Sequence, residues 1–290
     1  MTENHRRELW NDGMKIYRYW AKAAADQQPT DKFVECYGCS GESLEAALAN
    51  ARERANQIAA RMKQGQPPGQ YTYAERPVRE EIVDEFAHAD EQAAVITRNS
   101  YGSLILNTPR VLFADIDFKP PALSLSSLLG ALFGKKKPSQ EEQIIHRIEQ
   151  VVAAQPALGL RVYRTNNGFR CLAKSRTYDP LSEESNLLLK ELDADPMYKQ
   201  LCRVQECYRA RISPKPWRCG VDKPPARFPF LDPGVEQQYR AWQSEYERQA
   251  QSFSTCALIA DFGSAQVHPE AEAVMKLHDH FTCQGDGPLA

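Results

Sequence analysis

The stretch Val111-Leu-Phe-Ala-Asp-Ile-Asp-Phe118 decides the fold that the sequence predicts. Apolar residues alternate with two aspartates, and this period of two is typical of a β-strand. Asp115 and Asp117 therefore point to the same side of the strand. Carboxylates this close repel each other unless a cation lies beside them, and Mg²⁺ or Mn²⁺ is the usual one. The alternative is a pair of solvated aspartates on an exposed strand.

The composition is typical of a globular protein without a strong electrostatic preference. The chain has 290 residues, 42% of them hydrophobic and 26% charged, with a formal net charge of −2. Any affinity for nucleic acid or anionic membranes must therefore be local. The start lacks the apolar run of a secretion signal, and no stretch has the roughly 20 apolar residues of a membrane span. We expect a cytoplasmic protein.

The first 80 residues predict a small α/β unit. Its expected elements are a helix over 8–25, a strand over 32–37 and a long helix that begins after Ser43 and stops before Gly65. Ser43 is the expected N-cap, because its hydroxyl can accept a hydrogen bond from a free amide of the first turn. A polar connector then leads to a second unit over 81–290.

The second unit predicts an α+β domain. Its expected elements are strands over 94–97 and 103–106, the aspartate strand over 111–118, a helix over 141–154, strands over 160–165 and 169–175 joined by Asn166-Asn-Gly168, helices over 182–192 and 196–204, a strand over 207–213, a helix over 236–251, a strand over 256–262 and a helix over 269–282. We expect 119–140 to be a surface insertion; the alternative is a short interfacial membrane contact.

The element order from 111 to 213 is β-α-β-β-α-β, as in ferredoxin-like and RRM-like folds. Right-handed connections set the sheet order 4-1-3-2, with helices on one face and the aspartate strand in the centre. Side-chain alternation then predicts which residues share the open face with Asp115 and Asp117. They are Arg161, Tyr163 and Thr165 on the second strand, Arg170 and Lys174 on the third, and Arg209 and Arg211 on the fourth.

This predicted face has the chemistry of a phosphate site. Guanidinium groups bind phosphate oxygens in a bidentate geometry, and a metal ion held by carboxylates neutralises phosphate charge. The face is therefore suited to a nucleoside triphosphate or a polynucleotide. A network of salt bridges, in which these charges neutralise one another, is the alternative.

The segment after the fourth strand is strongly basic. The window 203–227 carries seven basic and two acidic residues. Two prolines restrict the backbone there, so Lys215, Trp217 and Arg218 would be presented at a low entropic cost. A cation–aromatic–cation run is suited to stacking on a base beside phosphate contacts. The alternative for Trp217 is a core residue that anchors the loop.

The cysteines and two histidines carry weaker metal signals. Eight cysteines without an export signal are expected to be reduced thiols. The alternative is a structural zinc site on Cys202, Cys207 and Cys219, although their spacing fits no common zinc module. His278-Asp-His280 also suggests a metal ligand pair, but residues i and i+2 of a helix do not share a face. We expect both histidines at a surface helix terminus.

Two segments of the second unit share motifs with a known family. They are Phe113-Ala-Asp-Ile-Asp117 and, after a helix, Arg161-Val-Tyr-Arg-Thr-Asn-Asn-Gly-Phe-Arg170. Together they resemble the archaeo-eukaryotic primase superfamily, which includes the primase-polymerases, over about residues 93–213. The segment Tyr208-Arg-Ala-Arg-Ile-Ser-Pro-Lys-Pro-Trp-Arg-Cys219 also resembles a group of bacterial proteins, and this likeness implies no mechanism.

The resemblance to the primases implies an RRM-like palm and a set of roles. Asp115 and Asp117 would be metal ligands, with Asp261 as the third carboxylate of the site. Thr165, Gly168 and Arg170 would lie on the nucleotide-binding strand, where the family has a histidine in place of the arginine.

We therefore expect a metal-dependent nucleotidyltransferase of the primase-polymerase type, using Mg²⁺ or Mn²⁺ and acting on a nucleoside triphosphate and DNA or RNA. One alternative is a non-catalytic RRM-like module that binds RNA or single-stranded DNA. Others are a nuclease or phosphodiesterase with the same aspartates, and a protein-interaction domain. Against the RRM-like module, such modules stack bases on exposed aromatic residues of the sheet, and Tyr163 is the only one expected there.

Overall fold

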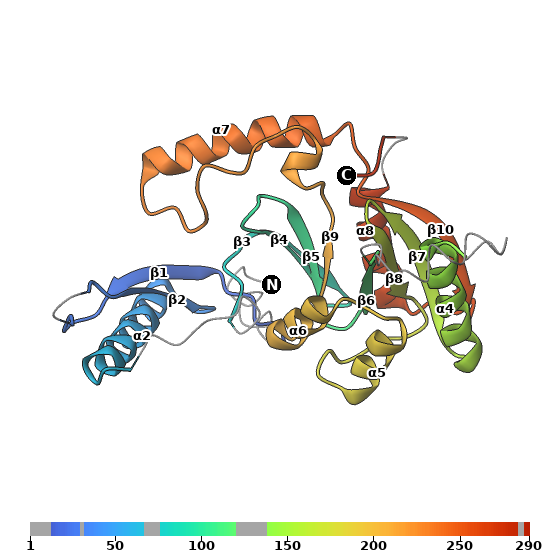
Figure 1. Cartoon of the computed structure of the whole chain (residues 1–290), viewed down its shortest axis with the longest axis horizontal. Coiled ribbons are helices and arrows are strands. Elements are labelled where there is room, and N and C mark those ends of the chain that lie inside the picture. Colours follow the sequence, from blue (N-terminus) through green and yellow to red (C-terminus); the bar gives the residue numbers. More distant parts are fainter. Residues whose placement is uncertain (1–12, 30–31, 67–75, 120–137, 284–286) are drawn as a thin grey trace, which may run out of the picture.

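The computed structural model describes residues 13–29, 32–66, 76–119, 138–283 and 287–290. Within them the protein is an α+β structure with three antiparallel sheets. One sheet has the order β1-β2, a second β10-β7-β8-β6 and a third β3-β4-β5-β9. In Figure 1, β1, β2 and α2 lie on one side of the molecule and the β10-β7-β8-β6 sheet lies on the other.

The N-terminal region consists of β1 (Tyr19–Ala24), β2 (Glu35–Ser40) and α2 (Leu44–Lys63). The predicted strand and helix are confirmed, and the Ser43 side chain accepts from Ala46 N as the expected N-cap. Gly38 lets the helix approach, because a Cβ there would lie 2.2 Å from Ala51 N. A helix over 8–25 is wrong: its first residues lie outside the described part, and its last ones pair with β2. This pairing with a distant segment overrides the local helical pattern.

The β3-β4-β5-β9 sheet lies between the other two sheets (Figure 1). It contains β3 (Glu81–His88), β4 (Glu91–Arg98), β5 (Leu104–Thr108) and β9 (Tyr208–Arg211). The hairpin of β4 and β5 is confirmed, whereas β3 was not predicted. The polar and acidic residues of β3 hide its strand character, and its pairing with β4 contains two register shifts.

The β10-β7-β8-β6 sheet contains the aspartate strand. Its strands are β6 (Phe113–Asp117), β7 (Gly159–Thr165), β8 (Gly168–Ala173) and β10 (Cys256–Gly263). Along the chain, three helices lie between these strands: α4 (Gln140–Ala154), α5 (Glu183–Glu191) and α6 (Pro196–Gln205). The predicted β-α-β-β-α-β order is therefore present, as is the tight hairpin before Gly168. The predicted insertion at 119–140 lies largely outside the described residues.

The expected partner of the aspartate strand is different in the structure. The fourth strand, β9, pairs with β5 and not with β6, so the sheet order 4-1-3-2 is not formed by main-chain pairing. The Tyr198 hydroxyl explains the difference, because it stands between the two strands. It donates to the Phe113 oxygen of β6 at 2.8 Å and accepts from the Arg209 amide of β9 at 3.4 Å. A side chain thus joins the two sheets where a ladder was expected.

Helices cover both faces of the β10-β7-β8-β6 sheet, which corrects the predicted open face. On one face, Arg164 of β7 pairs with Glu141 of α4 at 2.9 Å. On the other, the Tyr163 hydroxyl donates to Asp279 of α8 (Pro269–Thr282) at 2.6 Å. The alternation that put Arg161, Tyr163 and Arg170 on the aspartate face is confirmed by the strand register. That face is open only at its edge, because α8 packs across it (Figure 1).

The rest of the chain is a basic loop and one long helix. The loop begins with the 3₁₀ turn η2 (Pro216–Arg218) and leads to α7 (Pro233–Ala250), which packs over the end of the β4–β5 hairpin. A Cβ at Gly102 would lie 2.2 Å from the Trp242 ring, so glycine is needed at this contact. None of the helices in the described ranges is both long and apolar enough to span a bilayer.

Candidate functional site

Asp115 is paired with Arg170 across the β6–β8 ladder. The two residues are register partners, and Arg170 Nε and Nη2 donate to the two carboxylate oxygens at 2.7 and 3.1 Å. The Arg170 side chain is 3% exposed, and that of Asp115 is 32% exposed. This bidentate geometry gives a strong ion pair and fixes the direction in which the carboxylate points.

The third guanidinium nitrogen of Arg170 is also engaged. Nη1 donates to the Arg211 main-chain oxygen at 2.8 Å and lies 3.3 Å from His278 Nε2. Burial lowers the pKa of His278 to about 4, so at neutral pH the uncharged ring can accept from Arg170. His278 is wholly buried between Phe113 and Tyr163. The expected surface position is wrong for this histidine, because α8 lies across the sheet face.

Asp117, at the end of β6, is exposed and differs from Asp115 in its surroundings. No described residue forms an ion pair with its carboxylate, although the Asn167 side chain is a hydrogen-bond partner. Partial burial and the charges of Asp115 and Asp195 raise its pKa. Asp195, the N-cap of α6, is brought here because its main-chain amide donates to the Asp115 main-chain oxygen at 3.0 Å. The site thus collects negative charge around one carboxylate that has no ion-pair partner among the described residues.

Three half-buried cations lie near this carboxylate and will be called the loop cluster: Arg211, Lys215 and Arg218. Burial, together with the nearby charges of Arg170 and Arg218, lowers the pKa of Arg211 to about 10. Burial, Arg211 and Arg218 likewise lower the pKa of Lys215, while Asp117 opposes this shift. Within the described ranges, no aspartate or glutamate forms an ion pair with any member of the loop cluster, although Arg211 Nη1 donates to the Ser213 and Ala290 main-chain oxygens at 2.7 and 3.4 Å. The fold therefore holds three cations together with no ion pair to an aspartate or glutamate among the described residues, and such a group attracts an anion.

Two exposed aromatic side chains border the loop cluster. Trp217 is 47% exposed and Tyr101 is 38% exposed. Their rings meet edge to face with centroids 5.6 Å apart, and the Lys215 ammonium lies 5.6 Å from the Trp217 ring centroid. The alternative of a core tryptophan is excluded by this exposure. Tyr101 was missed because it sits in a turn of the β4–β5 hairpin, more than a hundred residues away in the chain.

Four cations from the predicted ring have carboxylate partners and will be called the sheet cations: Arg161, Arg170, Lys174 and Arg209. Arg209 Nη2 donates to both carboxylate oxygens of Glu80, at 2.7 and 2.9 Å, and both side chains are buried. The expectation that Arg209 lies on an open face is therefore wrong. It points into the β3-β4-β5-β9 sheet region because β9 pairs there, and its Glu80 partner comes from the predicted connector.

Arg161 and Lys174 are paired with Asp261, the predicted third carboxylate. Arg161 lies 3.3 Å from Asp261 and 2.8 Å from Asp279, and Lys174 lies 3.0 Å from Asp261. Asp261 is on β10, at the opposite edge of the sheet from β6. With strands about 4.8 Å apart, three strand steps separate it from Asp115 and Asp117 by about 14 Å. The structure does not bring Asp261 to the aspartates.

The remaining predicted residues of the nucleotide-binding strand have structural roles in this state. Tyr163 is fully buried and its hydroxyl is bonded to Asp279. Thr165 and Gly168 are register partners that close the β7–β8 hairpin. A Cβ at Gly168 would lie 2.0 Å from the Ile116 oxygen, so glycine allows β8 to approach β6. These residues thus shape the hairpin and the packing of β8 on β6.

The predicted zinc ligands are not gathered into one site. Cys202, Cys207 and Cys219 are all buried and have free thiols, and each packs in a different hydrophobic cluster. The Cys219 thiol donates to the Pro216 oxygen at 3.2 Å. In the described part of the chain, no three histidine, cysteine, aspartate or glutamate side chains are grouped so that they could hold a metal ion.

A divalent cation at Asp115 and Asp117 has to be judged by the donors present. Mg²⁺ is commonly held by one or two carboxylates, with substrate phosphates and water completing its shell. Asp117 offers both oxygens, whereas each Asp115 oxygen already accepts from Arg170 and keeps only its remaining lone pairs. The donor set fits an ion that is shared with a phosphate, and it does not fit a metal held by protein alone.

The aspartates, the loop cluster and the two aromatic rings together form one edge site between the two larger sheets. Searches of protein-family models, of curated proteins and of solved structures each found no match to this chain.

Proposed function

We propose that this protein binds the phosphates of a nucleoside triphosphate or of a nucleic acid strand at the loop cluster, and that it is a metal-dependent nucleotidyltransferase. One observation carries the proposal: Arg211, Lys215 and Arg218 stand together without an aspartate or glutamate ion-pair partner in the described chain, beside Asp117, whose carboxylate also has no ion pair there. Phosphate oxygens supply the missing negative charge.

Each residue of the site has a role in this proposal. The loop cluster binds and orients the phosphates, and the exposed ring of Trp217 stacks on a base with Tyr101 at its edge. Asp115 and Asp117 would hold Mg²⁺ or Mn²⁺, which supplies charge neutralisation and activation of a 3′-hydroxyl. Arg170 keeps the Asp115 carboxylate at a fixed angle, and Lys215 balances Asp117 until the ion arrives.

Binding of fluorescent ATP and of a labelled single-stranded oligonucleotide, with and without Mn²⁺, tests the proposal. Asp117→Asn removes a free carboxylate without exposing a buried cation, whereas Asp115→Ala would leave Arg170 buried and unpaired. We expect Asp117→Asn to abolish the Mn²⁺-dependent part of binding and Lys215→Ala/Arg218→Ala to weaken all of it. Arg248→Ala, which removes an arginine paired with Glu245 on α7, is the matched control. Binding that is unchanged in both Asp117→Asn and Lys215→Ala/Arg218→Ala would overturn the proposal.

The bidentate Arg170–Asp115 pair favours a second candidate, a non-catalytic protein that binds single-stranded RNA or DNA. An Asp115 whose oxygens stay on Arg170 contributes little to a metal site. Binding would then use the edge site, because Tyr163 is buried under α8 and offers no ring to a base. Primer-extension assays separate the candidates: extension with Mn²⁺ supports the transferase, and binding without metal, extension or cleavage supports the second candidate. Shortened products instead would identify a nuclease or phosphodiesterase.

A further inference from the structure

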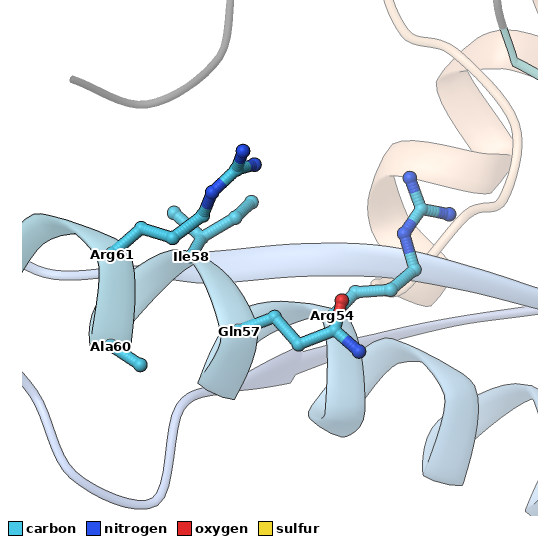
Figure 2. A pocket seen from close by; sticks show the side chains of 5 residues that line it. All are labelled: Arg54, Gln57, Ile58, Ala60 and Arg61. Carbon is cyan, nitrogen blue, oxygen red and sulfur yellow. The ribbon is translucent and has the colours of Figure 1, made fainter. Parts of the chain in front are cut away.

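A basic pocket lies on the N-terminal helix, apart from the aspartates. It has a volume of about 390 Å³ and is lined by Arg54, Gln57, Ile58, Ala60 and Arg61 of α2 (Figure 2). The two arginines are seven residues apart, which is nearly two turns, so they extend from the same side of the helix (Figure 2). No carboxylate lines the pocket. An anion would meet positive charge and a partly apolar floor there.

The packing of α2 leaves this side of the helix free. Ala47, Ala51, Ala55 and Ala59 are buried, whereas Arg54 is half-buried and Arg61 is exposed. Neither Arg54 nor Arg61 forms an ion pair within the described ranges. Arg52 of the same helix offers a contrast, because its Nε lies 3.6 Å from Asp26. Like the loop cluster, and unlike the sheet cations, Arg54 and Arg61 therefore have no carboxylate partner within the described ranges.

The chain that follows brings further cations to this region. Burial lowers the pKa of Arg76, and Arg54 is close enough to lower it further. The Arg79 guanidinium stacks at 3.8 Å from the Tyr37 ring centroid of β2. The buried Gln205 side chain fixes this segment, because it donates to the Arg76 oxygen and accepts from the Val78 amide. We call Arg54, Arg61, Arg76 and Arg79 the N-terminal basic surface.

One loop connects this surface with the loop cluster. It starts directly after Arg218 and carries two exposed cations, Lys223 and Arg227, and two exposed carboxylates, Asp222 and Asp232. Figure 1 shows the loop running back along α7 from η2 toward the side where β1 lies. Arg227 lies on the same side as Arg79, close enough for its charge to help lower the pKa of Arg79. Lys223 and Arg227 therefore place exposed cations on the loop that joins the two regions.

We infer that the loop cluster, the loop over 219–232 and the N-terminal basic surface form one continuous track for a single-stranded nucleic acid. This inference rests on the proposed function and specifies its substrate as a polynucleotide. Guanidinium groups spaced along a path match successive phosphates. The exposed Trp217 and Tyr101 rings at one end favour a single strand, because a base must be unpaired to stack on them.

Fluorescence anisotropy with labelled oligonucleotides of about 2 and about 20 nucleotides tests this track. The test variant is Arg54→Ala/Arg61→Ala, which keeps a strong helix former at both positions. Its matched control is Arg52→Ala on the same helix. We expect the test variant to bind the long strand about tenfold more weakly at low salt, and to reduce the slope of log K against log salt by about 1.4, which is two contacts of about 0.7 each. Dinucleotide binding and the control should not change.

The outcomes separate the track from the proposed function. If both oligonucleotides need Lys215 and Arg218 but neither responds to Arg54→Ala/Arg61→Ala, the track is wrong and the proposed function stands. If Lys215→Ala/Arg218→Ala changes the binding of neither oligonucleotide, the proposed function fails first. Polyglutamate that competes with the long strand at equal charge, with the same loss in the test variant, would identify the N-terminal basic surface as a contact for an acidic polypeptide and overturn the track.

Discussion

The sheet cations and the loop cluster have the same charge and opposite surroundings. Arg161, Arg170, Lys174 and Arg209 each have a carboxylate partner at 3.3 Å or less. The loop cluster has none among the described residues. The partners of the sheet cations come from distant parts of the chain, such as Glu80 and Asp261. The comparison teaches that a basic residue becomes a candidate for ligand binding only when the fold leaves it without an internal partner.

The two groups also differ in what holds them. Two of the sheet cations, Arg161 and Arg170, lie on strands where the ladder places their carboxylate partners Asp261 and Asp115 opposite them. The loop cluster lies at the end of β9 and around a turn with proline at positions 214 and 216, which the Ser103 and Tyr246 hydroxyls hold by donating to the Pro214 oxygen. Replacing members of each group should therefore affect different measurements: folding stability in one case and ligand affinity in the other.

The largest effect is expected for Arg209→Met. It leaves Glu80, whose side chain is 3% exposed, without its partner. Breaking a buried pair from one side costs about 3–5 kcal/mol of unfolding free energy, which denaturant titration measures. Arg209→Met/Glu80→Gln, which also removes the buried charge, should recover a large part of the loss. If Arg209→Met alone were as stable as the wild type, the Arg209–Glu80 pair would contribute nothing to the unfolding free energy.

The next effect concerns the histidine behind Arg170. The pKa of His278 is lowered to about 4 in the folded protein, so the unfolded chain takes up a proton below about pH 6.5 and the folded one does not. The resulting stability is present above pH 6.5 and is lost as the pH falls toward 4. Between pH 7 and 5, the wild type should lose about 2 kcal/mol of unfolding free energy from this group.

The control for this effect is His278→Gln, which keeps a hydrogen-bond acceptor near Arg170 but does not titrate. Asp279, Arg170 and Tyr163 face the ring in both proteins. The difference between their two pH profiles therefore reports the imidazole alone. Parallel profiles between pH 7 and 5 would contradict the assignment of a neutral, buried His278.

A smaller change in free energy is expected for Lys215→Ala/Arg218→Ala. This double variant should weaken binding of a single-stranded oligonucleotide about tenfold, which corresponds to about 1.4 kcal/mol. Its Tm should equal that of the wild type, because neither side chain has an ion pair within the described chain. A marked fall in Tm together with weaker binding would show that the loop cluster is structural, like the sheet cations.

The smallest effect is expected for Asp117→Asn. Its pKa is raised by partial burial, Asp115 and Asp195, so at neutral pH the ionised carboxylate opposes folding. Removing that charge should raise the Tm by about 2 °C or less, measured by calorimetry without divalent cations. The gain should disappear at a pH low enough to protonate Asp117. A fall in Tm would show that Asp117 is already neutralised by Lys215.

The hydrophobic patterns predicted most of the elements correctly. The alternation around Asp115, the Asn166-Asn-Gly168 turn and the Ser43 cap each depend on neighbours in the chain, and all three are confirmed. The errors lie where distant segments interact. The helix expected at 8–25 gives way to β1 through pairing with β2, and β9 pairs with β5 because Tyr198 stands beside β6.

The sequence by itself determined the α+β class, the shared face of Asp115 and Arg170, and the basic segment that holds Lys215 and Arg218. These follow from local periodicity and composition, which need no knowledge of distant contacts. Only the tertiary structure decided which cations stay unpaired, because the partners Glu80, Asp261 and Asp279 are brought in by strand pairing and by α8. Charge is encoded residue by residue, whereas its neutralisation depends on packing between segments far apart in the chain.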